Sequence, residues 1–270
     1  GCSSMSFARA LRLRAAGSAR SFATERPPLS HPKLHQRHIL FREGQEGNPG
    51  WAKALEVDPT SRYQLLKNAA DGIKLLAPDE VWHPKMLMGD TKVTAFCSGP
   101  REKDQLELLV YPDAVQLTGA ALEKRMPWLL HTLRASKPGE IDWAQTAARG
   151  GIEARSLMGT TQIFVCVHGS RDVRCGNCGP PVLDELRTQV ESLGLSDRVT
   201  VRGCSHLEGH AFAANVVVFH GGRPGRVPDS GVVHGDWYGY MEPKLCRLLL
   251  RHVTGGTPIK EIEALWRGRT

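Results

Sequence analysis

Two short segments rich in cysteine and histidine constrain the fold of this chain more than any other feature. The first runs from Cys166 to Pro180 (CVHGSRDVRCGNCGP) and the second from Gly203 to Asn215 (GCSHLEGHAFAAN). Each follows a short apolar run that is typical of a buried strand. Thiolate and imidazole groups bind zinc or iron–sulfur clusters well and bind calcium or magnesium poorly. The pattern therefore predicts a metal site where two strands end.

The spacing of these residues leaves more than one ligand set open. Cys175 and Cys178 have the spacing of a structural zinc site, with His206 and His210 as the matching histidine pair. Eight residues lie between Cys166 and Cys175, and this wider spacing suits a larger cluster. A metal-free alternative is a thiol–disulfide oxidoreductase that uses Cys175 and Cys178, because Cys178 precedes an expected helix N-terminus, which lowers the pKa of a thiol.

Other thiols and imidazoles lie close enough in sequence to compete for this site. Cys204 precedes His206 by two residues, and His168 follows Cys166 by two residues. We expect Cys204 to be a buried thiol at a strand end. Cys97 and Cys246 are expected to be core thiols as well.

The chain of 270 residues is long enough for two domains, on a prior of roughly 100–200 residues per domain. We expect an irregular lead-in over 25–50, because this segment holds several prolines and glycines. An N-terminal domain is predicted over 51–134, a linker over 135–160 and a second domain over 161–270. Helical and strand-like patterns alternate in the N-terminal domain, so the fold class is α/β or α+β.

The second domain has a characteristic order of expected elements. These are a strand at 161–167, a loop at 168–179, a helix that begins at Pro180, strands at 198–203 and 215–219, and a helix from Pro243 to Gly255. Strand, helix, two strands and helix is a thioredoxin-like order.

The N-terminal segment 1–24 has the composition of an organellar transit peptide. It contains four arginines, several small or hydroxylated residues and no acidic residue. The segment Arg20–Ala23 resembles a mitochondrial processing site of the type Arg-x-Phe, so the mature protein is expected to begin near Ala23 in the mitochondrial matrix. Removal of 1–24 lowers the formal charge from +7 to +3, which is little support for nucleic-acid binding. No apolar run approaches the roughly 18 residues of a membrane-spanning helix.

Several motifs together resemble the sucrase/ferredoxin-like family. They are CVHGSRDVRCGNCGP at 166–180, HLEGHAFAAN at 206–215, WYGY at 237–240, RHILF at 37–41 and LWRG at 265–268. The resemblance covers most of the expected mature chain. It implies a two-domain protein whose C-terminal domain is a thioredoxin-like ferredoxin.

The resemblance also implies a cofactor and its ligands. By position, a [2Fe–2S] cluster would be held by Cys166 and Cys175 and by His206 and His210. The chain departs from the family pattern at Glu208, which stands where a glycine is usual before the second histidine. This residue would add negative charge beside the cluster, and it would lower the reduction potential or mark a docking surface.

The implied ligand set favours an electron carrier over an enzyme with its own substrate. Two imidazoles leave the cluster less negative than four thiolates do, so its potential should lie well above the roughly −400 mV of plant-type ferredoxins. An imidazole bound through one nitrogen can carry a proton on the other, so reduction should be coupled to protonation. The function implied is one-electron transfer or redox sensing, with a redox partner protein or a larger mitochondrial complex. A cluster- or zinc-stabilised structural subunit of such a complex is the remaining alternative.

Overall fold

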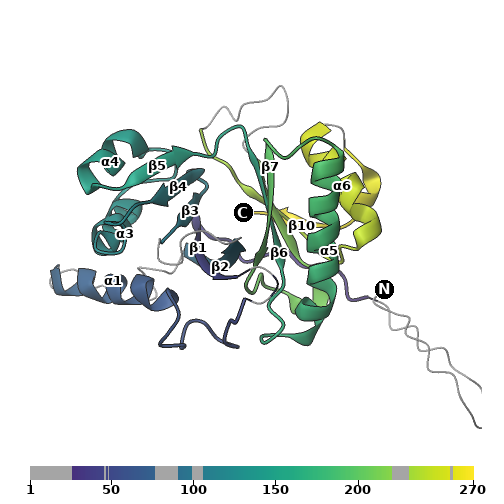
Figure 1. The fold of residues 1–270 in the computed structure, drawn as a ribbon, viewed down its shortest axis with the longest axis horizontal. Helices are drawn as coiled ribbons and strands as arrows, with labels where there is room; N and C mark the ends of the chain where they lie inside the picture. Colours follow the sequence, from purple (N-terminus) through teal and green to yellow (C-terminus); the bar gives the residue numbers. More distant parts are fainter. Residues whose placement is uncertain are drawn as a thin grey trace, which may run out of the picture.

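The computed structural model describes residues 26–45, 47, 49–76, 91–98, 106–220, 231–255 and 258–270. The expected transit peptide lies outside these residues. The strands of the described residues are β1 (Arg37–Gln45), β2 (Thr91–Ser98), β3 (Leu108–Tyr111), β4 (Val115–Thr118), β5 (Glu153–Ser156), β6 (Thr161–Cys166), β7 (Val199–Cys204), β8 (Val216–His220), β9 (Gly235–Tyr238) and β10 (Trp266–Arg269). They form one sheet in the order β10-β9-β8-β6-β7-β2-β1-β3-β4-β5. Each half of the chain therefore builds one half of the sheet (Figure 1).

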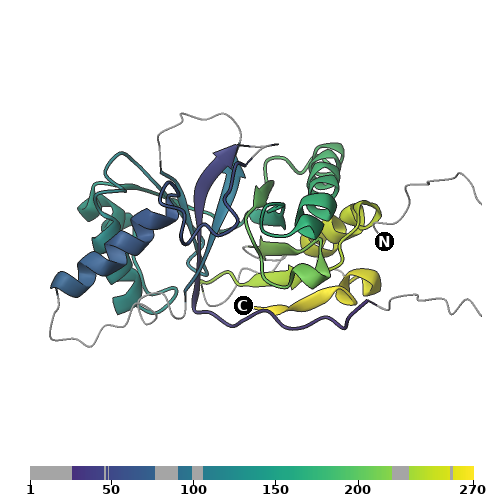
Figure 2. The same cartoon turned by 90° about the horizontal axis from the view of Figure 1, so that it is seen from below.

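Helices pack on both halves of this sheet. They are α1 (Tyr63–Leu76), α3 (Met126–Ala135), α4 (Trp143–Gly150), α5 (Val173–Ser192), α6 (Cys246–Gly255) and α7 (Lys260–Glu263), with short 3-10 turns η1 (His210–Phe212) and η2 (Pro243–Leu245). Figures 1 and 2 show α1, α3 and α4 on the side of the N-terminal strands that is remote from the C-terminal half. None of the helices in these residues is long and apolar enough to cross a bilayer.

The sequence of α3 illustrates why the helices of the N-terminal half form. Met126, Leu129, Leu130 and Leu133 are buried, and this spacing places them on one face of a helix. A proline in the first turn is tolerated there, because the N–H group that it lacks has no partner within the helix. The apolar face packs into a core together with β1, β3 and β4.

The C-terminal half has a thioredoxin-like fold, as the sequence predicts. Strand β6 is parallel to β7 and antiparallel to β8, and β8 is antiparallel to β9. Helix α5 makes the crossover between the two parallel strands, and α6 packs beside it (Figure 1). Val182, Leu186 and Val190 of α5 lie in one core cluster with Leu249 and Val253 of α6. This packing buries one face of the sheet.

The two halves meet at the sheet and share a core. Strands β2 and β7 pair antiparallel, with Phe96 opposite Cys204. Beyond β7, the N–H of Ser205 donates to the Ala95 carbonyl at 2.9 Å or less, and the Ser205 hydroxyl accepts from the Ala95 N–H at 2.9 Å. A buried cluster that joins the halves contains Phe96 together with Phe164 and both Cys166 and Cys204. The strand ends that carry the cysteines are thus fixed from both sides.

Two segments expected to be irregular contain regular structure. The predicted lead-in 25–50 includes the central strand β1, whose residues Ile39, Leu40 and Phe41 are buried. The predicted linker 135–160 includes α4 and β5. The sequence signals failed because the prolines of the first segment lie outside the strand and its glycines lie at or beyond the end of the strand, and because β5 is an edge strand with mostly exposed side chains.

Helix α5 begins earlier than predicted. The expected loop over 168–179 ends at Asp172, whose carboxylate accepts the Arg174 N–H at 3.0 Å and caps the helix. Pro180 and Pro181 lie inside the helix and remove two backbone donors. Close packing on the sheet outweighs this loss: a Cβ atom added to Gly179 would lie 2.1 Å from the Cys166 carbonyl oxygen.

The first described residues form an extended arm along the C-terminal half. The Tyr240 hydroxyl donates to the Pro27 carbonyl at 2.7 Å, and Arg26 pairs with Glu242 at 2.6 Å. Figure 2 shows this arm beside the C-terminal strand β10. The arm leads directly into β1 in the other half of the sheet.

Candidate metal centre

Three of the four predicted ligands converge at the ends of three different elements. The sulfurs of Cys166 and Cys175 and a ring nitrogen of His206 all lie within 4.8 Å of one another. Cys166 ends β6, Cys175 lies in the first turns of α5, and His206 follows β7. Both cysteines are fully buried and His206 is half-buried. The close approach of these soft donors fits a bound metal or a small cluster.

The fourth predicted ligand, His210, lies beside this group but outside it. Its ring centroid is 5.7 Å from that of His206. Its side chain is 49% exposed, and its Nε2 lies 4.0 Å from a carboxylate oxygen of Asp172. The structure therefore places His210 on the solvent side of His206.

The hydrogen bond between the two cysteines shifts their pKa values in opposite directions. A hydrogen bond from the Cys175 thiol lowers the pKa of Cys166 well below its ordinary value, although burial opposes ionisation. The same hydrogen bond raises the pKa of Cys175, and its burial adds to the effect. A metal bound by both sulfurs would displace their protons, because thiolate is the form that binds metal.

His206 has a ring nitrogen that is available to bind a metal. Its Nδ1 is buried and has no hydrogen-bond partner within the described residues. A buried ring nitrogen without a partner is costly unless a ligand or metal satisfies it. This atom and the cysteine sulfurs fit a metal or a [2Fe–2S] cluster in their chemistry.

His168 is held by other contacts and does not join the group. Its Nε2 lies 2.9 Å from the Ala52 carbonyl, and its Nδ1 accepts the backbone N–H of His206 at 3.2 Å. Both ring nitrogens are thus used, and the residue is 3% exposed. His168 positions the backbone of a predicted ligand instead of serving as one.

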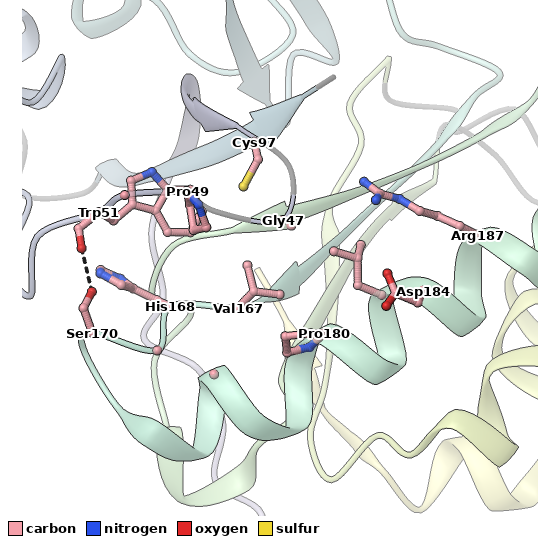
Figure 3. Close-up of a pocket in the computed structure, with 15 residues that line it drawn as sticks. Gly47, Pro49, Trp51, Cys97, Val167, His168, Ser170, Pro180, Asp184 and Arg187 are labelled. Atoms are coloured by element: carbon pink, nitrogen blue, oxygen red, sulfur yellow. Dashed lines mark hydrogen bonds between the residues drawn. The ribbon is translucent and has the colours of Figure 1, made fainter. Parts of the chain in front are cut away.

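Residues of the N-terminal half clamp the loop that follows β6. The Ser170 hydroxyl donates to the Trp51 carbonyl at 2.7 Å (Figure 3), and Arg171 donates to the Lys53 carbonyl at 3.2 Å. The Trp51 ring meets the His168 ring edge-on at 5.4 Å. Beside this clamp lies a pocket of about 570 Å³, into which the Cys97 thiol points (Figure 3). Cys97 is buried, as predicted for a core thiol.

The histidine loop is held by two residues that the sequence analysis did not assign. Arg267 of β10 donates to the Glu208 carbonyl at 3.0 Å and to the side chain of Asn215 at 2.8 Å. Asn215 in turn donates to the Gly209 carbonyl at 2.8 Å. Asn215 belongs to the motif HLEGHAFAAN and Arg267 to the motif LWRG, so these motifs could have indicated both residues. Arg267 is 5% exposed, and its guanidinium group makes these hydrogen bonds inside the protein.

Glu208 does not leave an uncompensated negative charge beside the site. Its carboxylate pairs with the Lys92 ammonium at 2.6 Å and accepts the Lys33 backbone N–H at 3.2 Å. Burial alone would raise the pKa of Glu208, but Lys92 lowers it below the ordinary value. The residue ties the histidine loop to β2 and to the N-terminal arm.

The sulfurs of Cys178 and Cys204 do not belong to the close group of donor atoms. Cys178 is half-buried inside α5 and packs on the core of the C-terminal half. Cys204 lies opposite Cys166 in the β6–β7 register, and burial raises its pKa well above the ordinary value. Because α5 already begins at Val173, Cys178 is not placed at the helix N-terminus that the dithiol alternative requires.

Fold and site together define a class: a thioredoxin-like half, joined to a second α/β half, with cysteine and histidine donors gathered at its strand ends. The sequence profile of the sucrase/ferredoxin-like family matches residues 28–268, and the chain belongs to this family. The chain is 37% identical over 252 residues to altered inheritance of mitochondria protein 32 of Debaryomyces hansenii, an alignment that covers 86% of this chain and 81% of the relative. A protein of the same name from Clavispora lusitaniae is 29% identical over 205 residues, covering 71% and 69%.

Among solved structures, the chain is similar to a thioredoxin-like [2Fe–2S] ferredoxin from Aquifex aeolicus. The two are 19% identical, with a TM-score of 0.31. The match covers 41% of this chain and 92% of the ferredoxin.

Proposed function

We propose that this protein holds a [2Fe–2S] cluster through Cys166, Cys175, His206 and His210 and acts in one-electron transfer or redox sensing. The observation that carries the proposal is the approach of two cysteine sulfurs and a histidine nitrogen to within 4.8 Å of one another. The ring of His210 beside His206 supplies a second imidazole at the solvent side. Membership of the sucrase/ferredoxin-like family supports the same ligand set.

Each residue has a distinct task in this proposal. The buried thiols of Cys166 and Cys175 would bind as thiolates and lose their protons on binding. His206 binds through a ring nitrogen, and His168 fixes its backbone. His210 is half-exposed and faces Asp172, so its outer nitrogen can exchange a proton with solvent. When bound, the cluster supplies a one-electron acceptor whose potential exceeds that of an all-cysteine cluster.

The proposed location is the mitochondrial matrix. The names of the fungal relatives refer to the inheritance of mitochondria. The basic, acid-free segment 1–24 is typical of a transit peptide. The proposed partner is a redox protein or a larger mitochondrial complex.

A zinc ion is the second candidate for this site. Two thiolates and two imidazoles are a common zinc ligand set, and the three close donors would suit a tetrahedral ion. The role would then be structural, as a subunit of a larger assembly.

Metal and sulfide analysis separates these candidates. Protein purified without oxygen should contain about two iron atoms and two acid-labile sulfides per chain, with visible absorption typical of a [2Fe–2S] centre. About one zinc per chain and a colourless solution would establish the zinc site instead. A metal-free protein with a reversible Cys175–Cys178 disulfide would establish the oxidoreductase and refute the proposal.

A further inference from the structure

A pocket of about 490 Å³ lies between the two halves, against the candidate metal centre. His206 lines this pocket together with Phe41 and Ala95 of the N-terminal strands. Its charged lining residues are Lys33, Lys53, Lys92, Arg171, Glu56 and Glu208. Four basic side chains thus face two acidic ones, a formal surplus of two positive charges.

The two acidic side chains are already engaged by basic residues of the same pocket. Glu208 pairs with Lys92 at 2.6 Å, and the Lys92 side chain is only 11% exposed. Glu56 pairs with Arg171 at 3.6 Å. Within the described part of the chain, the ammonium groups of Lys33 and Lys53 lie within ion-pair distance of no carboxylate, although the charge of Lys33 lowers the pKa of Glu208. These two lysines therefore carry the charge of the pocket that close ion pairs do not neutralise.

We propose that this pocket binds a small polyanionic molecule that carries carboxylate or phosphate groups. The volume is in the range of small-molecule sites, and such sites occur preferentially between domains. The basic side chains come from four separate segments: the N-terminal arm, the loop before α1, strand β2 and the loop before α5. Like charges gathered from separate segments repel one another, and an anion between them relieves this repulsion.

The anion would lie beside His206, so its binding would be linked to the redox state of the centre; this linkage rests on the proposed function. Reduction adds negative charge next to the pocket, and an anion binds less tightly to a more negative site. By reciprocity, the bound anion must lower the reduction potential by the same free energy. The pocket itself requires no cluster, so the two claims can fail separately.

Isothermal titration calorimetry of the purified protein at constant ionic strength tests the site. Citrate and pyrophosphate serve as the probes, and the one that binds identifies the anionic group. Lys33→Gln and Lys53→Gln each remove one unpaired charge from an exposed side chain, and each should weaken binding about tenfold. Lys124→Gln removes an exposed charge outside the pocket and should leave binding unchanged.

The proposed site would be refuted if neither probe binds, or if binding is unchanged in both pocket variants. Binding that weakens equally in Lys124→Gln would reveal a general charge effect and would also overturn it. The linkage is tested on the iron-loaded protein by redox titration with and without the bound probe. A tenfold difference in affinity between the oxidised and reduced states corresponds to a fall of about 59 mV, and an unchanged potential would refute the linkage alone.

Discussion

The cysteine side and the histidine side of the candidate centre are built in different ways. Cys166 and Cys175 are fully buried on a central strand and on the helix packed against it. His206 and His210 belong to a loop, and the side chain of His210 is 49% exposed. Side chains from distant parts of the chain hold this loop, above all Arg267 of β10.

This difference suggests separate roles for the two pairs of residues: one in retaining a cluster, the other in setting its reduction potential. Donors on packed strands and helices are held firmly, whereas donors on loops depend on the contacts that position the loop. We therefore infer that the cysteines determine whether a cluster is retained. In the proposed centre the histidines, of which His210 is half-exposed, would determine the potential of the cluster and its response to pH. The predictions below test this division, from the largest expected effect to the smallest.

The largest effect is expected at the cysteines. Cys166→Ser and Cys175→Ser should each abolish cluster binding, because a hydroxyl is a poor ligand for cluster iron and no further donor of the residues that the structure describes joins the close group. The measurement is iron and sulfide content together with the visible spectrum. The matched control is Cys178→Ser on the same helix, which should keep the spectrum. If Cys178→Ser loses the cluster and Cys166→Ser keeps it, the assignment of the ligands is wrong.

A smaller effect is expected at the histidines, where the cluster should persist with altered properties. In wild type, the midpoint potential should fall as pH rises, by up to about 59 mV per unit when one proton accompanies one electron. His206→Cys and His210→Cys should retain a cluster, because thiolate also binds iron. Each should lower the potential by about 100 mV or more and flatten the pH dependence. Redox titrations from pH 6 to 10 measure the midpoint potential and its pH dependence. A wild-type potential that does not change with pH would exclude histidine ligands.

The anchor of the histidine loop should affect stability more than chemistry. Arg267→Gln removes buried, charge-assisted hydrogen bonds to Glu208 and Asn215 and should lower the free energy of unfolding by about 3 kcal/mol. Urea denaturation measures this change. Arg247→Gln removes an exposed hydrogen bond to Gln189 and should cost less than about 0.5 kcal/mol. Equal effects of the two variants would show that Arg267 does not anchor the loop.

The smallest effect is expected at Glu208. Its charge is compensated by Lys92, so Glu208→Gln should raise the reduction potential by only about 20 mV. The lowered pKa of Glu208 means that its ionised form stabilises the fold at neutral pH. This contribution is present above the ordinary pKa of glutamate and is lost as pH falls through the lowered value. Urea denaturation of wild type and Glu208→Gln should therefore converge as the pH falls below 4, and a constant difference would contradict the ion pair.

The thioredoxin-like half was accessible to sequence reasoning because its signals are local. The apolar runs of β6 and β8 are buried throughout, and the apolar face of α5 has helical spacing. The parallel strands β6 and β7 end at the same edge of the sheet, and α5 begins shortly after β6, so Cys166, Cys175 and His206 come close together there. The assignment of Cys166, Cys175, His206 and His210 as ligands remains a prediction.

The parts that sequence reasoning missed depend on contacts between distant residues. Strand β1 is flanked by proline and glycine, and only its pairing with β2 and β3 establishes it as central. Helix α5 continues through Pro180 and Pro181 because Gly179 packs against the backbone of β6. The role of Arg267 depends on partners more than 50 residues away, which no local pattern predicts.

Mössbauer spectroscopy of protein loaded with isotopically enriched iron tests the central claim most directly. Two thiolates on one iron and two imidazoles on the other make the two iron sites inequivalent, so the oxidised protein should show two quadrupole doublets of equal area. The doublet of the imidazole-bound iron should change in His206→Cys and His210→Cys, while the other doublet stays. A single doublet, or no cluster iron in fully folded protein, would contradict the account.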